Sequence, residues 1–152
     1  MQFSTITAVS ILSALAVAAP ATNNVAVVSK AADGAQWTIQ SFQRICNTSP
    51  PTQCNWSFTI NTNDGSPTTA CGFSTFAQGS TPADQTPETG ASCGGYTVSS
   101  GWSGQFGPGN GFTTLAVVNN AARLIVYPAY TDVQLAPGTP VTPDQSYPVI
   151  KL

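Results

Sequence analysis

The chain has 152 residues, of which only 7% are charged, and its formal net charge is −2 with no histidine. Its four lysines and arginines are too few to neutralise the phosphates of a nucleic acid, and the same shortage disfavours binding to an acidic membrane surface. The lack of histidine removes the commonest general base and a common metal ligand. We therefore expect a protein that is not an enzyme and that uses no metal and no cofactor.

Residues 1–18 have the pattern of a secretory signal peptide. An apolar stretch runs into small residues, and Ala16 and Ala18 fit the positions of an A-x-A cleavage site. We place the cut after Ala18, because a cut after Ala19 would leave Pro20 at the new N-terminus. The stretch is too short to cross a bilayer comfortably, and no later segment reaches transmembrane length. We therefore expect a secreted, extracellular protein.

The remaining chain is long enough for one β domain, which we place at residues 36–152. Residues 19–35 are weakly patterned and are expected to form a flexible lead or a first edge strand. From there on apolar and polar residues alternate, with Trp37 and Ile39 on one face. A bulge is expected before Phe42, because the alternation changes phase there.

Alternation returns at several later places in the chain. Further strands are predicted at residues 56–60, 69–73, 96–102, 112–118, 123–127 and 131–135, with an edge strand or an extended tail at 149–150. The stretches 78–92 and 101–112 are expected to be irregular, because proline or glycine interrupts them. About eight short strands with no helical period predict an all-β fold, either a small single-domain β-barrel or a β-sandwich.

Four cysteines, Cys46, Cys54, Cys71 and Cys93, are expected to form two disulfides, since an even number in a secreted chain indicates a disulfide framework. Four cysteines allow three connectivities. We prefer Cys46 with Cys54 and Cys71 with Cys93, because each pair brackets one connection between neighbouring predicted strands. A zinc site is the alternative, which the lack of histidine and of a C-x-x-C spacing disfavours.

The glycine-rich stretch at residues 101–112 is the best candidate for a recognition loop, since loops on a rigid β scaffold commonly carry binding. It contains the aromatic residues Trp102, Phe106 and Phe112. The alternative is that these aromatic rings fold back over the core. We prefer that alternative for Trp102 and Phe112 and leave Phe106 open. The other two tryptophans are expected in the core, because alternation places them on inner faces.

A hydrolase that uses a carboxylate pair would need two acids facing each other across a cleft. Asp84 and Glu88 are close in the sequence, but they lie in a stretch rich in proline and threonine, where we expect solvated charges. Asp132 is the better candidate for a catalytic acid. We nevertheless prefer a role for Asp132 as a turn or ladder cap.

Two sequons, which begin at Asn47 and Asn55, are candidate N-glycosylation sites in a secreted chain. Asn55 adjoins Cys54 and starts a predicted strand, so its side chain is constrained. We therefore prefer Asn47 as the acceptor.

A family resemblance rests on residues 37–44, 56–60 and 101–114 and on Cys46 and Cys54. As a set, these segments resemble the small secreted proteins of filamentous fungi, in particular the elicitors of a plant-pathogenic fungus that induce a hypersensitive response. The resemblance extends from Trp37 to about Tyr147. A more distant likeness, limited to the Trp-x-Ile start and the cysteine-bearing β-rich layout, links the chain to the fungal allergen family, which folds as a β-barrel.

The resemblance implies a compact β-barrel with intact disulfides that plant cells perceive and that triggers defence responses and sometimes local cell death. Our leading hypothesis is a non-enzymatic, monomeric elicitor or effector that binds a plant cell-surface or apoplastic partner. The second hypothesis is a carbohydrate- or cell-wall-binding module that uses Phe106, Trp102 or Tyr130. The third is a glycan hydrolase that uses Asp132 and a second acid.

Overall fold

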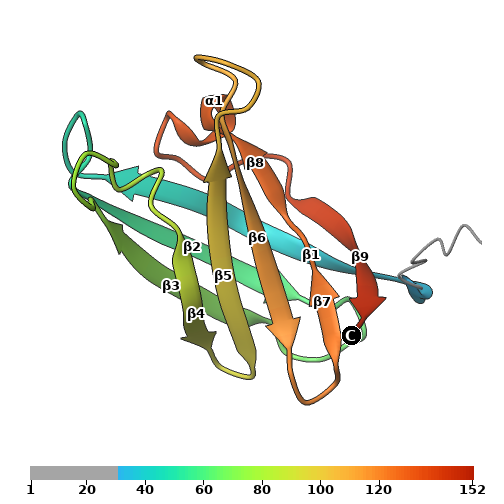
Figure 1. Ribbon diagram of the computed structural model, residues 1–152. Coiled ribbons are helices and arrows are strands. Elements are labelled where there is room, and N and C mark those ends of the chain that lie inside the picture. The colour runs from blue at the N-terminus through green and yellow to red at the C-terminus, as the bar shows by residue number, and fades with distance from the viewer. Residues whose placement is uncertain (1–30) are drawn as a thin grey trace, which may run out of the picture.

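The computed structural model describes residues 31–152, whose regular secondary structure consists almost entirely of β-strands (Figure 1). The strands are β1 (Ala31–Cys46), β2 (Gln53–Asn61), β3 (Thr69–Phe76), β4 (Glu88–Cys93), β5 (Tyr96–Ser103), β6 (Phe112–Asn119), β7 (Leu124–Val126), β8 (Ala129–Thr131) and β9 (Gln145–Lys151), and the helix in this range is α1 (Asp132–Leu135). The all-β prediction is confirmed. No helix in the described part of the chain is long and apolar enough to cross a membrane.

Two of the sequence-based predictions concern the N-terminal part of the chain. The predicted signal peptide at residues 1–18 lies outside the described residues. So does most of the predicted lead at residues 19–35, of which the last residues, from Ala31 on, belong to β1.

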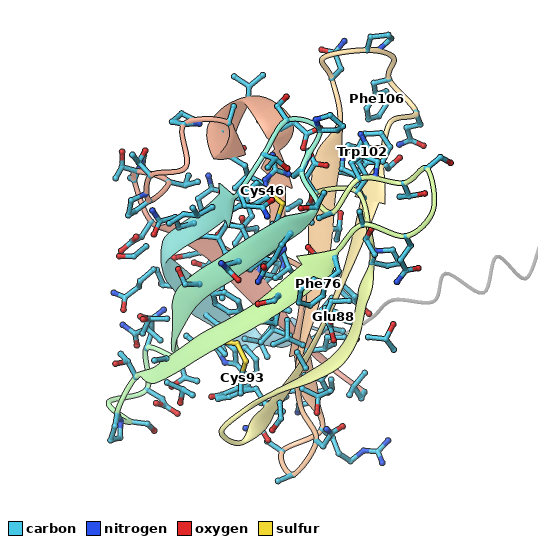
Figure 2. The ribbon with its side chains drawn as sticks, turned by 90° about the vertical axis from the view of Figure 1, so that its left-hand side faces the viewer. Cys46, Phe76, Glu88, Cys93, Trp102 and Phe106 are labelled. Carbon is cyan, nitrogen blue, oxygen red and sulfur yellow. A yellow bond between two sulfur atoms is a disulfide. The ribbon has the colours of Figure 1, made fainter. Side chains whose placement is uncertain are left out.

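All strands of the described range belong to one sheet, in which neighbouring strands are antiparallel. The order along the sheet is β3-β2-β1-β9-β7-β6-β5-β4, and β8 pairs with β6 beside this path. The sheet curls until its outermost strands meet, where the disulfide between Cys71 on β3 and Cys93 on β4 joins them at a Cα–Cα distance of 5.0 Å. The fold is a nearly closed β-barrel with a covalent bridge across its seam (Figure 2).

The other disulfide joins Cys46 to Cys54, whose Cα atoms are 4.0 Å apart. These residues are also directly paired in the β1–β2 ladder. Both predicted disulfide pairings are therefore confirmed.

The barrel interior is filled by aromatic and branched side chains. The rings of Phe42 and Tyr130 stack with centroids 4.0 Å apart and planes 2° apart. Trp37 and Trp56 are 3% and 2% exposed, so their predicted place in the core is confirmed. The indole Nε1 of Trp56 donates to Oγ1 of Thr75 at 3.0 Å, which satisfies the one polar group that this ring buries.

A β-bulge in β1 changes which residues face the core. The pairing register with β2 shifts between Gln40 and Gln43, and the backbone N–H of Ser41 donates to Asp144 Oδ1 at 2.8 Å. The extra residue of the bulge reverses the alternation of the strand. As a result, the side chains of Phe42 and Arg44 are buried. The predicted bulge before Phe42 is confirmed.

The connection between β3 and β4, at residues 77–87, packs beside the seam. Ala83 is fully buried, and its carbonyl oxygen accepts from Thr75 Oγ1 at 2.6 Å while its N–H donates to Pro51 O at 2.9 Å. The irregular stretch predicted in this region is shorter than expected, because β4 begins at Glu88 and pairs with β5.

The strand predicted at residues 131–135 is wrong, because Asp132–Leu135 form the helix α1. Oγ1 of Thr131 accepts from the backbone N–H of Gln134 at 3.3 Å, and Oε1 of Gln134 accepts from the backbone N–H of Thr131 at 2.8 Å. This reciprocal capping box starts a helix where the apolar residues happen to be spaced by two.

The edge strand or tail predicted at residues 149–150 is also wrong, because β9 lies between β1 and β7 inside the sheet. Pro148 pairs with β1, whereas β7 pairs with β9 at Ile150 and Lys151. The short β7 does not extend as far as Pro148. The proline, which has no N–H, therefore breaks no hydrogen bond between β9 and β7.

Candidate functional site

The long connections gather at one end of the barrel, which we call the loop end (Figure 1). The loop end comprises α1 and the connections at residues 47–52, 77–87 and 104–111. The opposite end, which we call the hairpin end, comprises the turns at residues 62–68, 94–95 and 120–123. Three depressions in the described part of the chain are lined at least in part by residues of the loop end.

Trp102, near the end of β5, is fixed in place. Its indole Nε1 donates to Oδ2 of Asp132 at 2.9 Å. The loop backbone lies directly on the ring at two glycines: a Cβ at Gly104 would come within 2.5 Å of the indole, and a Cβ at Gly111 within 2.8 Å. These glycines therefore allow an approach that any side chain would prevent, and Trp102 anchors the loop.

Phe106 and Phe112 form the other part of the predicted recognition loop. Phe106 is 66% exposed at the tip of the loop (Figure 2). Its ring stacks on the half-buried ring of Phe112 with centroids 5.7 Å apart. The sequence did not indicate whether Phe106 lies in the core or at the surface. The structure places it at the surface.

An apolar groove of about 490 Å³ lies beside these two rings. Its lining residues are Phe106, Gly109, Asn110, Phe112, Ala129, Tyr130, Thr131 and Val133. None of them is charged, and Val133 of α1 is 71% exposed. The sequence analysis missed Val133, because it assigned this residue to a strand. The structure instead places Val133 on the surface of α1, beside a loop that is distant in the sequence.

Tyr130 borders the apolar groove but is only 1% exposed. Its hydroxyl has no hydrogen-bond partner among the described residues, and burial raises its pKa well above the usual value, with a further contribution from Tyr147. One face of the ring is covered by Phe42. Tyr130 therefore offers no open face on which a sugar ring could stack, contrary to that part of the carbohydrate-binding hypothesis.

Asp132 connects the loop end to the core. Its Oδ1 accepts from Nη1 of Arg44 at 3.3 Å, and the backbone N–H of Asp132 donates to Gly111 O at 2.9 Å. Arg44 is 7% exposed, and its guanidinium lies over the Trp56 ring, 5.4 Å from the centroid. The role expected for Asp132 as a turn or ladder cap is wrong, because its carboxylate oxygens accept from the Arg44 and Trp102 side chains, and Thr131 caps α1. Asp132 instead ties α1 to β1 and to the recognition loop.

The acid pair required by the hydrolase hypothesis is not brought together at Asp132. The depression that Asp132 lines has a volume of about 370 Å³, and none of its other lining residues is acidic. Asp84 lines a different depression, together with Arg44. In residues 31–152, no group of three histidine, cysteine, aspartate or glutamate residues is arranged to hold a metal ion.

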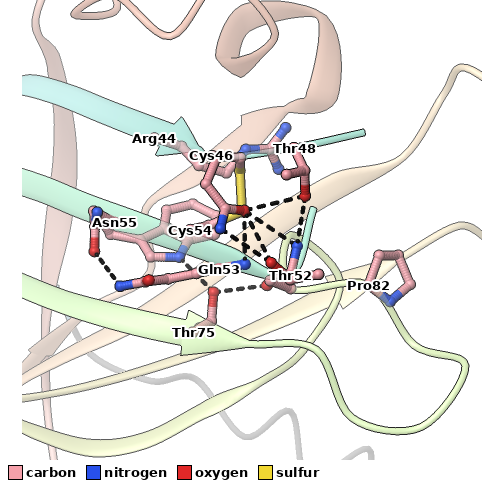
Figure 3. The surroundings of a disulfide bond; sticks show 12 residues. Arg44, Cys46, Thr48, Thr52, Gln53, Cys54, Asn55, Thr75 and Pro82 are labelled. Carbon is pink, nitrogen blue, oxygen red and sulfur yellow. Dashed lines mark hydrogen bonds between the residues drawn. A yellow bond between two sulfur atoms is a disulfide. The ribbon is translucent and has the colours of Figure 1, made fainter. Parts of the chain in front are cut away.

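Both predicted glycosylation sequons lie beside the disulfide between β1 and β2 (Figure 3). Oδ1 of Asn47 accepts from the backbone N–H of Gln53 at 3.0 Å, and its Nδ2 donates to Thr52 Oγ1 at 3.0 Å. Asn55 is exposed on β2, and no hydrogen bond found in the described residues uses its Nδ2. Because Nδ2 carries the glycan, this geometry favours Asn55, the reverse of the sequence-based preference.

Comparison with known proteins supports the resemblance seen in the sequence. Residues 38–152 match the model of the family described as Effector TSP1. The protein Effector TSP1 of Hypocrea virens (strain Gv29-8 / FGSC 10586) is 46% identical over 112 residues, which cover 74% of this chain and 74% of that protein. The resemblance to a fungal effector is thereby confirmed, and the family and the disulfides are consistent with secretion. The chain belongs to the Effector TSP1 family.

Proposed function

We propose that this protein is a secreted effector that triggers plant defence responses and hypersensitive cell death by binding a plant cell-surface or apoplastic partner, without a catalytic step. The observation that carries the proposal is the apolar groove beside Phe106. Membership of an effector family supports the general class, and the groove supplies a surface through which such a protein would contact its partner.

The groove has the properties of a protein contact site. Two large apolar side chains, Phe106 and Val133, stay 66% and 71% exposed at its rim, and water-exposed apolar surface of this kind marks interaction sites. Aromatic side chains at the centre of an interface often contribute about 2 kcal/mol or more to binding. Phe106 is the residue of this loop that is placed to do so.

The scaffold reduces the cost of binding. The loop that carries Phe106 is fixed by the contact between Trp102 and Asp132, and Asp132 is in turn bound to β1 through Arg44. A loop that is already ordered loses little conformational entropy when a partner binds. The groove lining contains no acid or base, so the surface is suited to contact rather than to reaction.

The proposal is tested by infiltrating leaves with purified mature protein and scoring the oxidative burst and cell death against dose. Phe106→Ala is expected to raise the half-maximal dose at least about tenfold, which corresponds to about 1.4 kcal/mol of lost binding energy. Phe76→Ala is the matched control, because Phe76 is 56% exposed on β3, lies away from Phe106 (Figure 2) and does not line the groove. It should retain the wild-type dose response.

Circular dichroism checks that both variants fold. Equal potency of Phe106→Ala and Phe76→Ala would remove the groove as the contact site, and a silent wild-type protein would overturn the elicitor proposal itself. A reduced and alkylated sample should be inactive, because the groove exists only in the folded barrel. Full activity of that sample would mean that a linear peptide is sensed.

A further inference from the structure

We propose that a second depression at the loop end, distinct from the apolar groove, binds a ring of a neutral glycan. This depression, which we call the indole slot, has a volume of about 370 Å³ and is lined by Gln85, Trp102, Asp132, four loop glycines and Pro108. It shares one lining residue, Gly109, with the apolar groove, so the two sites are neighbours separated by the loop.

Trp102 supplies the slot with a flat apolar surface whose orientation is already set. The indole is partly exposed, and it is held by the hydrogen bond to Asp132 and by the backbone at Gly104 and Gly111. A pyranose ring presents a face of C–H groups that packs well on such a ring. Because the indole does not have to move, little of the binding energy is spent on ordering it.

The slot also offers free hydrogen-bonding groups beside the indole. A carboxylate has about four acceptor sites, and Asp132 uses one oxygen for Arg44 and the other for Trp102, which leaves acceptor sites on both oxygens. Asp132 is 28% exposed, so a ligand hydroxyl can reach it. Gln85 adds an amide whose side chain makes no hydrogen bond among the described residues.

The charge of the slot selects a neutral ligand over an acidic one. Asp132 is the only charged residue in the lining, and the slot contains no lysine or arginine. The guanidinium of Arg44 binds Oδ1 of Asp132, and Arg44 lines a separate depression rather than the slot. A uronic acid would bring its carboxylate close to that of Asp132, whereas the hydroxyls of a neutral sugar would donate to it.

The size of the slot suits a small ligand. Its volume of about 370 Å³ lies within the range of about 300–1,000 Å³ that is usual for ligand pockets.

The experiment is an NMR titration of the full mature protein with neutral oligosaccharides of glucan, cellulose and chitin, and with an oligogalacturonide as the acidic comparison. The Trp102 indole N–H signal, assigned by its loss in Trp102→Phe, reports on the slot. We expect at least one neutral oligosaccharide to shift this signal with a Kd of about 1 mM or lower. Gln85→Ala should weaken that binding about fivefold.

Gln105→Ala is the matched control, because Gln105 is an exposed glutamine of the 104–111 connection that does not line the slot. It should bind like the wild type, and so should Phe106→Ala, whose side chain lines only the groove. The proposal is overturned if no neutral oligosaccharide shifts the Trp102 signal, if Gln85→Ala and Gln105→Ala bind equally, or if the oligogalacturonide binds more tightly. Since the titration involves no plant tissue, its outcome is independent of the elicitor proposal.

Discussion

The disulfides at the two ends of the barrel stabilise different kinds of structure. At the loop end, Cys46 and Cys54 are already partners in the β1–β2 ladder, so the bond reinforces a pairing that hydrogen bonds also maintain. Near the hairpin end, Cys71 and Cys93 connect strands that share no ladder. The first disulfide joins strands that are already hydrogen-bonded to each other, whereas the second joins strands that no hydrogen-bonded ladder connects.

Removal of the seam disulfide should have the largest effect on stability. For the 22-residue separation between Cys71 and Cys93, loop-closure entropy predicts a loss of about 3.4 kcal/mol in the free energy of unfolding of Cys71→Ala/Cys93→Ala. Urea denaturation measures this loss, and hydrogen exchange should become faster in β3 and β4. A loss no larger than that for the other disulfide would contradict the distinction between the two.

Removal of the disulfide at the loop end should cost less. The separation between Cys46 and Cys54 is 8, for which the same reasoning predicts about 2.5 kcal/mol for Cys46→Ala/Cys54→Ala. Because the ladder remains, hydrogen exchange in β1 and β2 should keep its native protection relative to the rest of the barrel. Selective loss of protection in these strands would show that the bond, and not the ladder, holds them together.

The ion pair behind the recognition loop should contribute less than either disulfide. Asp132→Asn keeps the shape of the side chain but leaves the buried guanidinium of Arg44 without its counter-charge. We expect a loss of about 1–2 kcal/mol, below the value for fully buried pairs, because Asp132 is 28% exposed. Glu88→Gln is the control, because the Glu88 carboxylate makes no hydrogen bond or ion pair among the described residues, and it should stay within about 0.5 kcal/mol of the wild type in the same urea titration. Equal losses for both variants would contradict a special role for the pair.

The smallest effect is expected in the 62–68 turn of the hairpin end. Hydrogen bonds, first from the Thr62 side chain and then from Ser66, lower the pKa of Asp64 from 3.8 to about 2. A lowered pKa stabilises the fold above pH 3.8 and ceases to do so as the pH falls through about 2. Thr62→Ala should therefore raise the pKa of Asp64, measured by NMR of its carboxyl carbon, and any loss of stability should vanish in acid. An unchanged pKa would mean that Thr62 is not the main cause.

Local patterns in the sequence predicted the barrel well. Alternation of Trp56, Phe58 and Ile60 with polar residues predicted a half-buried strand, and all three are in the core. The cysteine spacing predicted both disulfides, because each pair brackets one connection. These features depend on neighbours that are close along the chain, which is why a single sequence reveals them.

Features that depend on distant contacts were missed. Asp132 and Arg44 are 88 residues apart, and nothing near either residue indicates the ion pair. The apolar spacing of Val133 and Leu135 fits a strand, although the Thr131-x-x-Gln134 capping signal was present in the sequence and marks a helix start. The position of β9 was missed because proline normally indicates an edge, and the short length of β7 could not be foreseen.

The closed seam also determines how the protein behaves beside copies of itself. The terminal strands of the sheet lie beside each other across the disulfide between Cys71 and Cys93, so each strand restricts access to the free edge of the other. Neither β3 nor β4 contains a lysine or proline, the residues that commonly protect a free strand edge from aggregation. We therefore expect the oxidised seam to protect the barrel from self-association and a reducing environment to promote it.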